Sequence, residues 1–334
     1  NYGCSQLDGD HENTRKVLGD ICLHPNAGGV LVLSLGCENN QPDAFMEMLG
    51  DYDHERIKLL VTQKVEGDEV EEAMKILRQL YALAVKDKRE DVPVSKLRIG
   101  LKCGGSDGFS GITANPLVGE LSDWLVAQGG TTVLTEVPEM FGAETILMNR
   151  CKTNELFQKT VSMINNFKEY FLSHGEPVGE NPSPGNKAGG ISTLEDKALG
   201  CTQKCGKGPV SGVMEYGERI THDGLNLLSA PGNDLVASTA LAASGCQIVT
   251  FTTGRGTPFG TFVPTMKIST NNDLATRKSN WIDFNAGQLL LGKDMKSVRD
   301  SFIDKVIAVA SGEKARNEIN GYSEIAIFKN GVTL

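Results

Sequence analysis

Residues 97–137, LRIGLKCGGSDGFSGITANPLVGELSDWLVAQGGTTVLTEV, contain the pattern that decides the fold. The apolar run at 97–102 is typical of a buried strand, and glycine-rich residues follow it directly. The sequence then predicts a helix around 116–128, with Pro116 suited to its first turn, and a second strand at 131–137. A strand, a helix and a second strand in this order indicate a parallel sheet with helices on its faces.

The same alternation continues on both sides of this stretch. Strands are predicted at 29–35, 58–62, 225–229 and 247–253, and helices at 68–86, 153–172, 234–244 and 294–311. The predicted fold class is therefore α/β, with open, mostly parallel sheets flanked by helices and arranged as two Rossmann-like subdomains. The proline- and glycine-rich loop 173–190, SHGEPVGENPSPGNKAGG, predicts the boundary between them. We expect a first α/β domain at 1–175 and a second at 176–334.

Composition and charge exclude several classes of protein. The 334 residues include 42 acidic and 33 basic side chains, a net charge of −9, which argues against nucleic acid as a partner. No apolar run reaches the roughly 18 residues that span a bilayer, and the N-terminus lacks the pattern of a signal peptide. The eight cysteines form no CxxC pair. These features predict a cytoplasmic protein without a disulfide framework, and the start at Asn1 suggests a fragment or a processed form.

Several predicted strands lead directly into glycine and polar residues. These junctions are 36–40, 103–108, 231–234 and 254–258. In an open α/β sheet, ligands bind beyond the carboxyl ends of strands, where turns present backbone N–H groups to anions. The junctions predict a site for an anionic small molecule, although each could also be only a tight connection. Arg255, between two glycines, is suited to bidentate capture of a carboxylate.

Other residue types leave two interpretations open. Lys187 and Lys197 lie in a glycine-rich segment near Glu195, where a lysine could act as a base or bind a substrate carboxylate. The same charges could equally be a solvated helix start. Cys37 and Cys103 follow predicted strands beside glycines, as metal ligands could, although free cysteines are commonly buried apolar side chains. The sequence contains no GxSxG elbow, no phosphate-binding GxxxxGK[ST] loop and no complete dinucleotide fingerprint.

Longer motifs resemble one enzyme family over essentially the whole chain. They are YGCSQ (2–6), HPNAG (24–28), LGCENNQ (35–41), KCGGSDGFSGITANP (102–116), ENPSPGNKAGGISTLEDKALGCTQK (180–204) and TGRGTPFGTFVPTMKI (253–268). The chain thereby resembles the altronate/galactarate dehydratase family. The resemblance implies a lyase, more narrowly a hydro-lyase, that converts D-altronate to 2-dehydro-3-deoxy-D-gluconate in hexuronate (galacturonate) catabolism. ENNQ and TLEDKALGCTQ favour altronate over galactarate.

The resemblance also implies a cofactor and partners. The expected cofactor is Fe²⁺, with Mn²⁺ or an iron–sulfur cluster as alternatives, and the expected assembly is a homo-oligomer. The resemblance further implies an N-terminal SAF domain, which we expect to be absent from this chain. The alternatives are a galactarate dehydratase or a sulfo-lyase on the same scaffold, or a binding or oligomerisation fragment that needs the missing domain.

Residue roles follow from the resemblance and from the chemistry of removing a proton beside a carboxylate. The metal is expected near Cys4, Cys37 and Cys103. The catalytic candidates are Lys197, Glu195 and Lys187. Substrate binding is assigned to Arg255, Ser106, Asp107, Asn186, Asn233 and Asp234.

Overall fold

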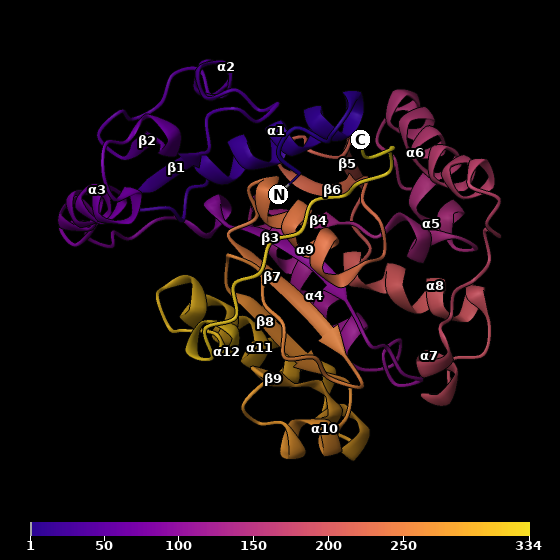
Figure 1. Cartoon of the computed structure of the whole chain (residues 1–334). Helices are drawn as coiled ribbons and strands as arrows, with labels where there is room; N and C mark the ends of the chain where they lie inside the picture. The colour runs from indigo at the N-terminus through magenta and orange to yellow at the C-terminus, as the bar shows by residue number, and fades with distance from the viewer. Residues whose placement is uncertain (1) are drawn as a thin grey trace. The chain divides into compact units, whose positions relative to one another are not determined.

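The computed structural model describes residues 2–334 and divides into two compact units. The first unit comprises residues 1–91 together with 327–334, of which residue 1 lies outside the described residues, and the second comprises residues 92–326. Figure 1 shows the course of the chain through both units. The second unit is thus an insertion in the sequence of the first.

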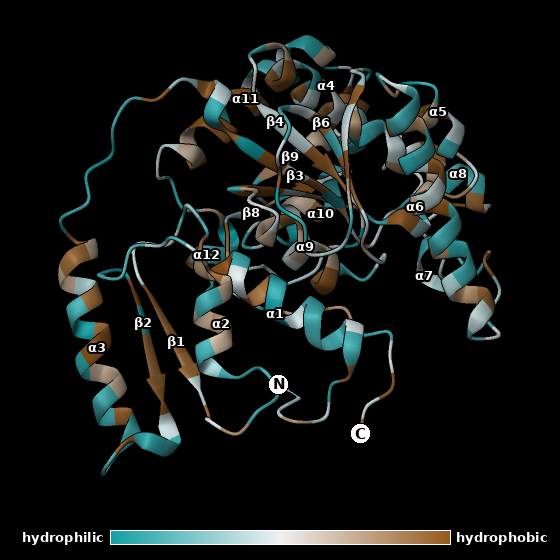
Figure 2. Ribbon diagram, turned by 90° about the horizontal axis from the view of Figure 1, so that it is seen from above, coloured by the Kyte–Doolittle hydropathy of each residue, from teal (hydrophilic) through white to brown (hydrophobic). Residues whose placement is uncertain are grey.

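The first unit has a small parallel sheet with helices. Its elements are α1 (Asp8–Cys22), β1 (Val30–Ser34), α2 (Pro42–Met48), β2 (Ile57–Val61), the 3₁₀ turn η1 (Thr62–Lys64) and α3 (Glu69–Ala84). β1 pairs with β2 in parallel, and both strands are hydrophobic along most of their length (Figure 2). Asp68 is the N-cap of α3, because its carboxylate accepts hydrogen bonds from the first free N–H groups of that helix.

The C-terminal segment completes the first unit. The Asp10 carboxylate on α1, which is buried, accepts hydrogen bonds from the backbone N–H groups of Asn330 (2.9 Å) and Gly331 (2.8 Å). Gln6 and Thr333 form an isolated antiparallel bridge. The two ends of the chain are therefore held together within one unit.

The second unit is built on a seven-stranded sheet in which every pairing is parallel. Its strands are β3 (Arg98–Cys103), β4 (Thr131–Leu134), β5 (Val210–Met214), β6 (Gly224–Leu228), β7 (Ile248–Thr253), β8 (Thr265–Ser269) and β9 (Phe284–Asn285). Their order across the sheet is β5-β6-β4-β3-β7-β8-β9. From β3 the chain first adds strands β4, β5 and β6 on one side of the sheet and later adds β7, β8 and β9 on the other side. The strand order therefore reverses beside β3.

Helices and 3₁₀ turns precede, connect and follow these strands. They are η2 (Val94–Lys96), α4 (Ala114–Ala127), η3 (Val137–Met140), α5 (Glu144–Met148), α6 (Asn154–Ser173), α7 (Pro184–Ala188), α8 (Leu194–Thr202), η4 (Gln203–Cys205), α9 (Asp234–Ala243), α10 (Asn272–Arg277), η5 (Ala286–Leu291), α11 (Met295–Ala310) and α12 (Arg316–Ile319). α9 packs against β3, where Gly100 leaves room for Leu241. α4 packs against η4, where a side chain at Gly119 would collide with the Gln203 carbonyl.

The predicted α/β class and parallel sheet are confirmed, whereas the division into two halves is corrected. β3 and β4 precede the loop 173–190, and β6 and β7 follow it, yet all four strands pair in one sheet. Position 175 therefore lies inside the second unit, and the two predicted Rossmann-like subdomains share one sheet. The boundary between compact units follows Asp91 instead. No helix within residues 2–334 has the length and apolar composition needed to cross a bilayer.

Candidate functional site

The carboxyl ends of the central strands gather most of the predicted site residues. Because the sheet is parallel, the segments after β3, β4, β6 and β7 leave from the same edge. The reversal of direction between β3 and β7 marks the place where open α/β sheets bind ligands. Three of the four predicted polar junctions lie at this edge, and the fourth, at 36–40, belongs to the first unit.

The larger cavity at this edge measures about 510 Å³. Its lining includes Asp107, Gly189, Gly254, Arg255, Asn271 and Arg277. The Arg255 side chain is exposed, and its guanidinium forms no ion pair with any residue of the described chain, 2–334. Arg277 is paired with Asp273 at 3.4 Å. Arg255 is therefore free to bind an anion that enters the cavity.

Asp107 positions the loops around this cavity. Its carboxylate accepts hydrogen bonds from the N–H of Phe109 (3.2 Å), the hydroxyls of Ser110 (3.1 Å) and Thr270 (2.9 Å), and the amide of Asn271 (3.1 Å). These donors come from the segments that follow β3 and β8. Both carboxylate oxygens are thus engaged by the protein, so Asp107 joins two loops of the site and shapes the cavity wall.

Gly254 is the close-packed neighbour of this carboxylate. A Cβ atom at position 254 would lie 2.1 Å from the Asp107 Cγ atom. The backbone N–H groups of Gly254 and Arg255 both donate to the Gly105 carbonyl at 3.0 Å. The absence of a side chain at Gly254 therefore lets the loops after β3 and β7 meet, and it sets the position of Arg255.

A smaller cavity of about 190 Å³ adjoins the first, and Asp107 lines both. Ser106, Asn115, Ile191, Lys197, Gly200 and Cys201 are among its lining residues. Lys197 and Cys201 come from α8, one helical turn apart, so both side chains face the same way. The predicted Lys197 is thereby placed on a cavity wall.

Buried polar groups hold the Lys197 ammonium. Its Nζ lies 2.9 Å from a Glu139 carboxylate oxygen and donates to the side-chain oxygens of Asn181 (3.1 Å) and Asn186 (3.2 Å). Asn186 in turn donates to the Ser106 carbonyl at 2.9 Å. Burial alone would lower the pKa of Lys197, but the Glu139 carboxylate outweighs it and raises the pKa above its usual value. Lys197 is therefore a fixed positive charge.

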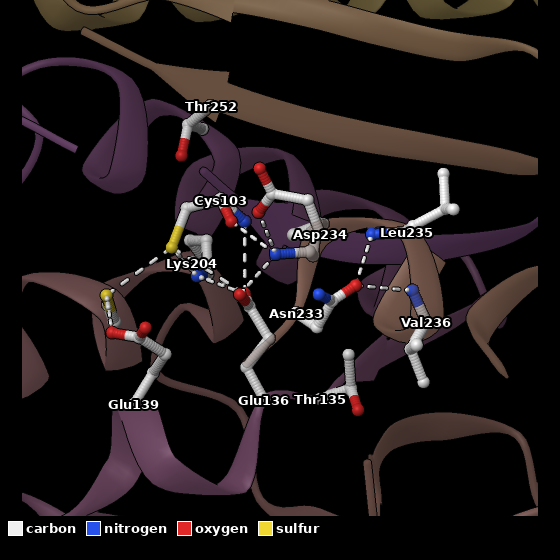
Figure 3. A network of polar contacts seen from close by, with 12 residues as sticks. Cys103, Thr135, Glu136, Glu139, Lys204, Asn233, Asp234, Leu235, Val236 and Thr252 are labelled. Atoms are coloured by element: carbon white, nitrogen blue, oxygen red, sulfur yellow. Dashed lines mark hydrogen bonds and ion pairs between the residues drawn. The ribbon is translucent and has the colours of Figure 1, made fainter. Parts of the chain in front are cut away.

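Beside this lysine lies an ion network that we define as Lys102, Cys103, Glu136, Lys204 and Asp234, all buried except Asp234, whose side chain is 41% exposed. Figure 3 shows Cys103, Glu136, Lys204 and Asp234 of this network. Lys102 forms ion pairs with Glu136 and, at 2.9 Å, with Asp234. Lys204 binds the other Glu136 oxygen at 3.2 Å and the Cys103 sulfur at 2.8 Å. Glu136 has φ +69°, a left-handed conformation that is uncommon for a residue with a side chain. The two lysines thus hold Glu136 at the turn after β4.

The charges of the network stabilise one another. Burial raises the pKa of Glu136, but the Lys102 and Lys204 ammonium groups outweigh it and hold that pKa below its usual value. Burial lowers the pKa of Lys102 and Lys204, and their anionic neighbours raise both above the usual range. All three groups are therefore charged near neutral pH, although each side chain is at most 1% exposed.

Two thiols join the network to the cavity. The sulfur atoms of Cys103 and Cys201 lie 3.4 Å apart, and Cys201 also contacts Glu139 at 3.5 Å. The hydrogen bond from Cys201, assisted by the Lys204 ammonium, lowers the pKa of Cys103, whereas donating that bond and burial raise the pKa of Cys201. Cys103 therefore has the greater thiolate character of the two.

The predicted metal ligands are divided between the two units. Cys4 and Cys37 belong to the first unit, where the Gly3 carbonyl accepts a hydrogen bond from the N–H of Asn39 at 3.1 Å. Cys103 belongs to the second unit, where its sulfur lies 2.8 Å from the Lys204 ammonium, 3.4 Å from the Cys201 sulfur and 3.6 Å from a Glu136 carboxylate oxygen. Within residues 2–334, no three His, Cys, Asp or Glu side chains converge as a metal site would require. The metal site near Cys4, Cys37 and Cys103 therefore stays a prediction.

The remaining predicted residues lie in different surroundings. Lys187 on α7 and Glu195 in the first turn of α8 are exposed. Asn233 caps α9 by accepting hydrogen bonds from the N–H groups of Leu235 and Val236, both at 3.1 Å. Asp234 is the partner of Lys102. The structure thus groups Ser106, Asp107, Asn186, Lys197 and Arg255 around the two cavities.

Sequence reasoning missed the charged core of the site. Its missed members are Lys102, Glu136, Glu139, Cys201 and Lys204. One signal was present, because Lys102 interrupts an apolar strand that is otherwise typical of a buried position. A lysine there requires a buried acid, and the run TEVPEM after the next strand supplies two.

Comparisons with known proteins identify the family. The model described as "D-galactarate/Altronate dehydratase, C-terminal" matches residues 94–333, and the one described as "D-galactarate dehydratase/Altronate hydrolase, second domain" matches residues 1–85. The chain belongs to the D-galactarate/altronate dehydratase family. Its enzyme class is accordingly that of the hydro-lyases. The two matches meet close to the observed division after Asp91.

Three relatives show how far the similarity extends. The chain is 62% identical to altronate dehydratase of Bacillus subtilis (strain 168) and 59% identical to altronate dehydratase of Escherichia coli (strain K12). Each match covers 100% of this chain and 67% of the relative. Galactarate dehydratase (L-threo-forming) of Escherichia coli (strain K12) is 35% identical over 94% of this chain and 62% of its own length. The chain thus spans about two thirds of the length of these relatives.

Proposed function

We propose that this chain is the catalytic part of a dehydratase that converts D-altronate to 2-dehydro-3-deoxy-D-gluconate in hexuronate catabolism. The observation that carries the proposal is the pair of cations at adjoining cavities. Lys197 is a buried ammonium on the wall of one cavity, and Arg255, on the wall of the other, has no ion-pair partner among residues 2–334. High identity to two proteins named altronate dehydratase supports altronate as the substrate.

The chemistry of dehydration explains why cations are needed. Removing the hydrogen at C2 of an aldonate places negative charge beside a carboxylate that is already negative. A dianion of this kind forms at a useful rate only where fixed positive charges face the oxygens that gain charge. Hydroxide then leaves from C3, and the enol product becomes the 2-keto acid.

We assign Arg255 to the substrate carboxylate and Lys197 to the oxygens that gain charge during proton removal. Arg255 offers a planar pair of N–H donors, which matches the geometry of a carboxylate. Lys197 is held by Glu139 and two asparagines, so its position is set before substrate arrives. A raised pKa suits this role better than that of a base, because Lys197 would first have to lose a proton that Glu139 stabilises.

The requirement for iron stays a prediction from the resemblance. No step of the proposed chemistry is assigned to it. Iron content of protein purified without oxygen, measured beside altronate dehydration by the same sample, tests this requirement directly. The homo-oligomer, the cytoplasmic location and the role of an SAF domain likewise stay predictions.

The proposed function is tested by turnover and by exchange of the C2 hydrogen with solvent. Lys197→Ala is expected to reduce both at least 100-fold, the order that mutagenesis gives for removing one preorganised charge-stabilising group. Lys207→Ala removes an exposed lysine close to α8 and serves as the matched control, with unchanged rates. Full exchange in Lys197→Ala would exclude Lys197 from the proton-removal step.

A panel of substrates distinguishes the alternatives. Preference for altronate over galactarate and sulfolactate by at least tenfold in kcat/KM is the expected result. Preference for galactarate would assign the chain to the other dehydration reaction, and release of sulfite from sulfolactate would assign it to carbon–sulfur cleavage. Binding of altronate without turnover would support the interpretation that the chain is a binding module, since a ligand that binds only the folded state raises its Tm.

A further inference from the structure

The thiols of Cys103 and Cys201 are placed for a reaction with each other that dehydration does not use. Their sulfur atoms lie 3.4 Å apart, and both residues are buried. Cys103 comes from the end of β3 and Cys201 from α8, so 98 residues of sequence separate them. A disulfide requires a sulfur–sulfur distance of about 2.05 Å, which is an approach of little more than 1 Å from the observed position.

The two sulfur atoms differ in their access to the cavity and in their charged neighbours. Cys201 lines the 190 Å³ cavity, so a small oxidant in that cavity meets this sulfur first. Cys103 lies behind it, with the Lys204 ammonium 2.8 Å from its sulfur. A positive charge at this distance supports nucleophilic attack by Cys103 on an oxidised neighbour.

We propose that Cys103 and Cys201 form a peroxide-sensitive site that closes to a disulfide and stops catalysis. The part concerning catalysis rests on the proposed function, because Cys201 contacts Glu139, which holds Lys197. Closing the sulfur pair moves Cys201 relative to Glu139 and converts the Cys103 thiol that faces Lys204 into a disulfide sulfur. Both changes occur beside the cation that the proposed reaction needs.

The reaction consumes one hydroperoxide for each disulfide. The Cys201 sulfur attacks a peroxide oxygen, the O–O bond breaks, and the thiol proton leaves with the departing oxygen as water. The resulting sulfenic acid is attacked at sulfur by Cys103, the S–S bond forms and the S–O bond breaks. Hydroxide leaves with the proton that was originally on Cys103, as the second water. Two thiols are thus oxidised by two electrons, and hydrogen peroxide is reduced to two waters.

Mass spectrometry can identify this bond because trypsin places the two cysteines in separate peptides. Trypsin cuts after Lys102 and Arg150, and after Lys197 and Lys204, so the peptides 103–150 and 198–204 each contain one cysteine. Cys205 falls in a separate peptide, 205–207. The reduced, folded chain is treated with hydrogen peroxide, its free thiols are alkylated, and the digest is analysed without reductant.

The expected result is a linked pair of 103–150 and 198–204 that dithiothreitol releases. The pair is absent in Cys201→Ser and retained in Cys151→Ser, which replaces a cysteine whose sulfur already contacts the Thr160 hydroxyl at 3.3 Å. Recovery of both peptides only in alkylated form, or a bond from Cys103 to a different cysteine, would overturn the proposal.

Activity provides the second measurement. Altronate dehydration is expected to fall at least tenfold as the linked peptides accumulate and to return with dithiothreitol. Full activity of the linked protein would overturn the link to catalysis. A reduced chain that does not dehydrate altronate would contradict the proposed function, and the peptide measurement would still decide whether this cysteine pair is oxidised.

Discussion

Replacing Glu136 by glutamine should destabilise the second unit strongly. Glu136 is 1% exposed and binds two buried ammonium groups, those of Lys102 and Lys204. Glutamine keeps the shape of the side chain but removes its charge, and it turns an N–H₂ donor toward groups that are also donors. Two charge-assisted contacts of about 1.5–3 kcal/mol each are lost. We expect the free energy of unfolding to fall by about 3–5 kcal/mol, the range observed when one partner of a buried ion pair is removed.

Urea unfolding followed by tryptophan fluorescence can measure this change in the right unit. The two tryptophans, Trp124 and Trp281, both lie in residues 92–326, so their emission reports on the second unit alone. Glu144→Gln is the matched control, because Glu144 pairs with Lys168 at 2.7 Å where both side chains are partly exposed. That control should lose less than about 1 kcal/mol. A loss below about 1 kcal/mol in Glu136→Gln would refute the view that Glu136 holds the buried lysines.

Three further predictions concern pH and the larger cavity. Because the pKa of Glu136 is lowered in the folded state, its contribution to stability is present above the unfolded value of about 4.3 and is lost as pH falls below it. The stability difference between wild type and Glu136→Gln should therefore narrow below about pH 4 in acid unfolding curves, and a constant difference would contradict this origin. Gly254→Ala should raise the KM for altronate about tenfold or more, because the added Cβ atom would lie 2.1 Å from Asp107 Cγ. Gly179→Ala is the control and should leave KM unchanged, because no atom lies within 4 Å of a Cβ at that position. Arg255→Gln should raise KM by about 10- to 100-fold, from the loss of a charged hydrogen bond, and Arg255→Lys by less; equal KM values in all three proteins would remove Arg255 from the substrate site.

The fold was largely predictable because each buried element has a local pattern. The apolar runs that predicted strands at 29–35, 97–102 and 247–253 became β1, β3 and β7 within one or two residues. The loop 173–190 led to a wrong prediction of the domain boundary, since proline and glycine also occur in loops that pack against a site. Ser183 within it begins α7 with a capping box, and Asn186 binds Lys197.

The site was predictable only where local sequence carries the signal. Lys197 and Arg255 lie in glycine-rich motifs, and the structure places both on cavity walls. For Lys102 the sequence indicates only that a buried acid is needed; it does not identify the partners, because Glu136 and Asp234 lie 34 and 132 residues away. Contacts over such distances depend on the strand order of the sheet, and periodicity does not determine strand order.

The insertion of the second unit into the first has a consequence for biosynthesis. Residues 1–91 leave the ribosome before residues 92–326, but the segment 327–334 that Asp10 binds emerges only after both. The first unit therefore cannot reach its final structure until translation has passed through the whole second unit. Until then the buried carboxylate of Asp10 has no backbone partners from that segment, so the first unit is completed only after the second unit has been made.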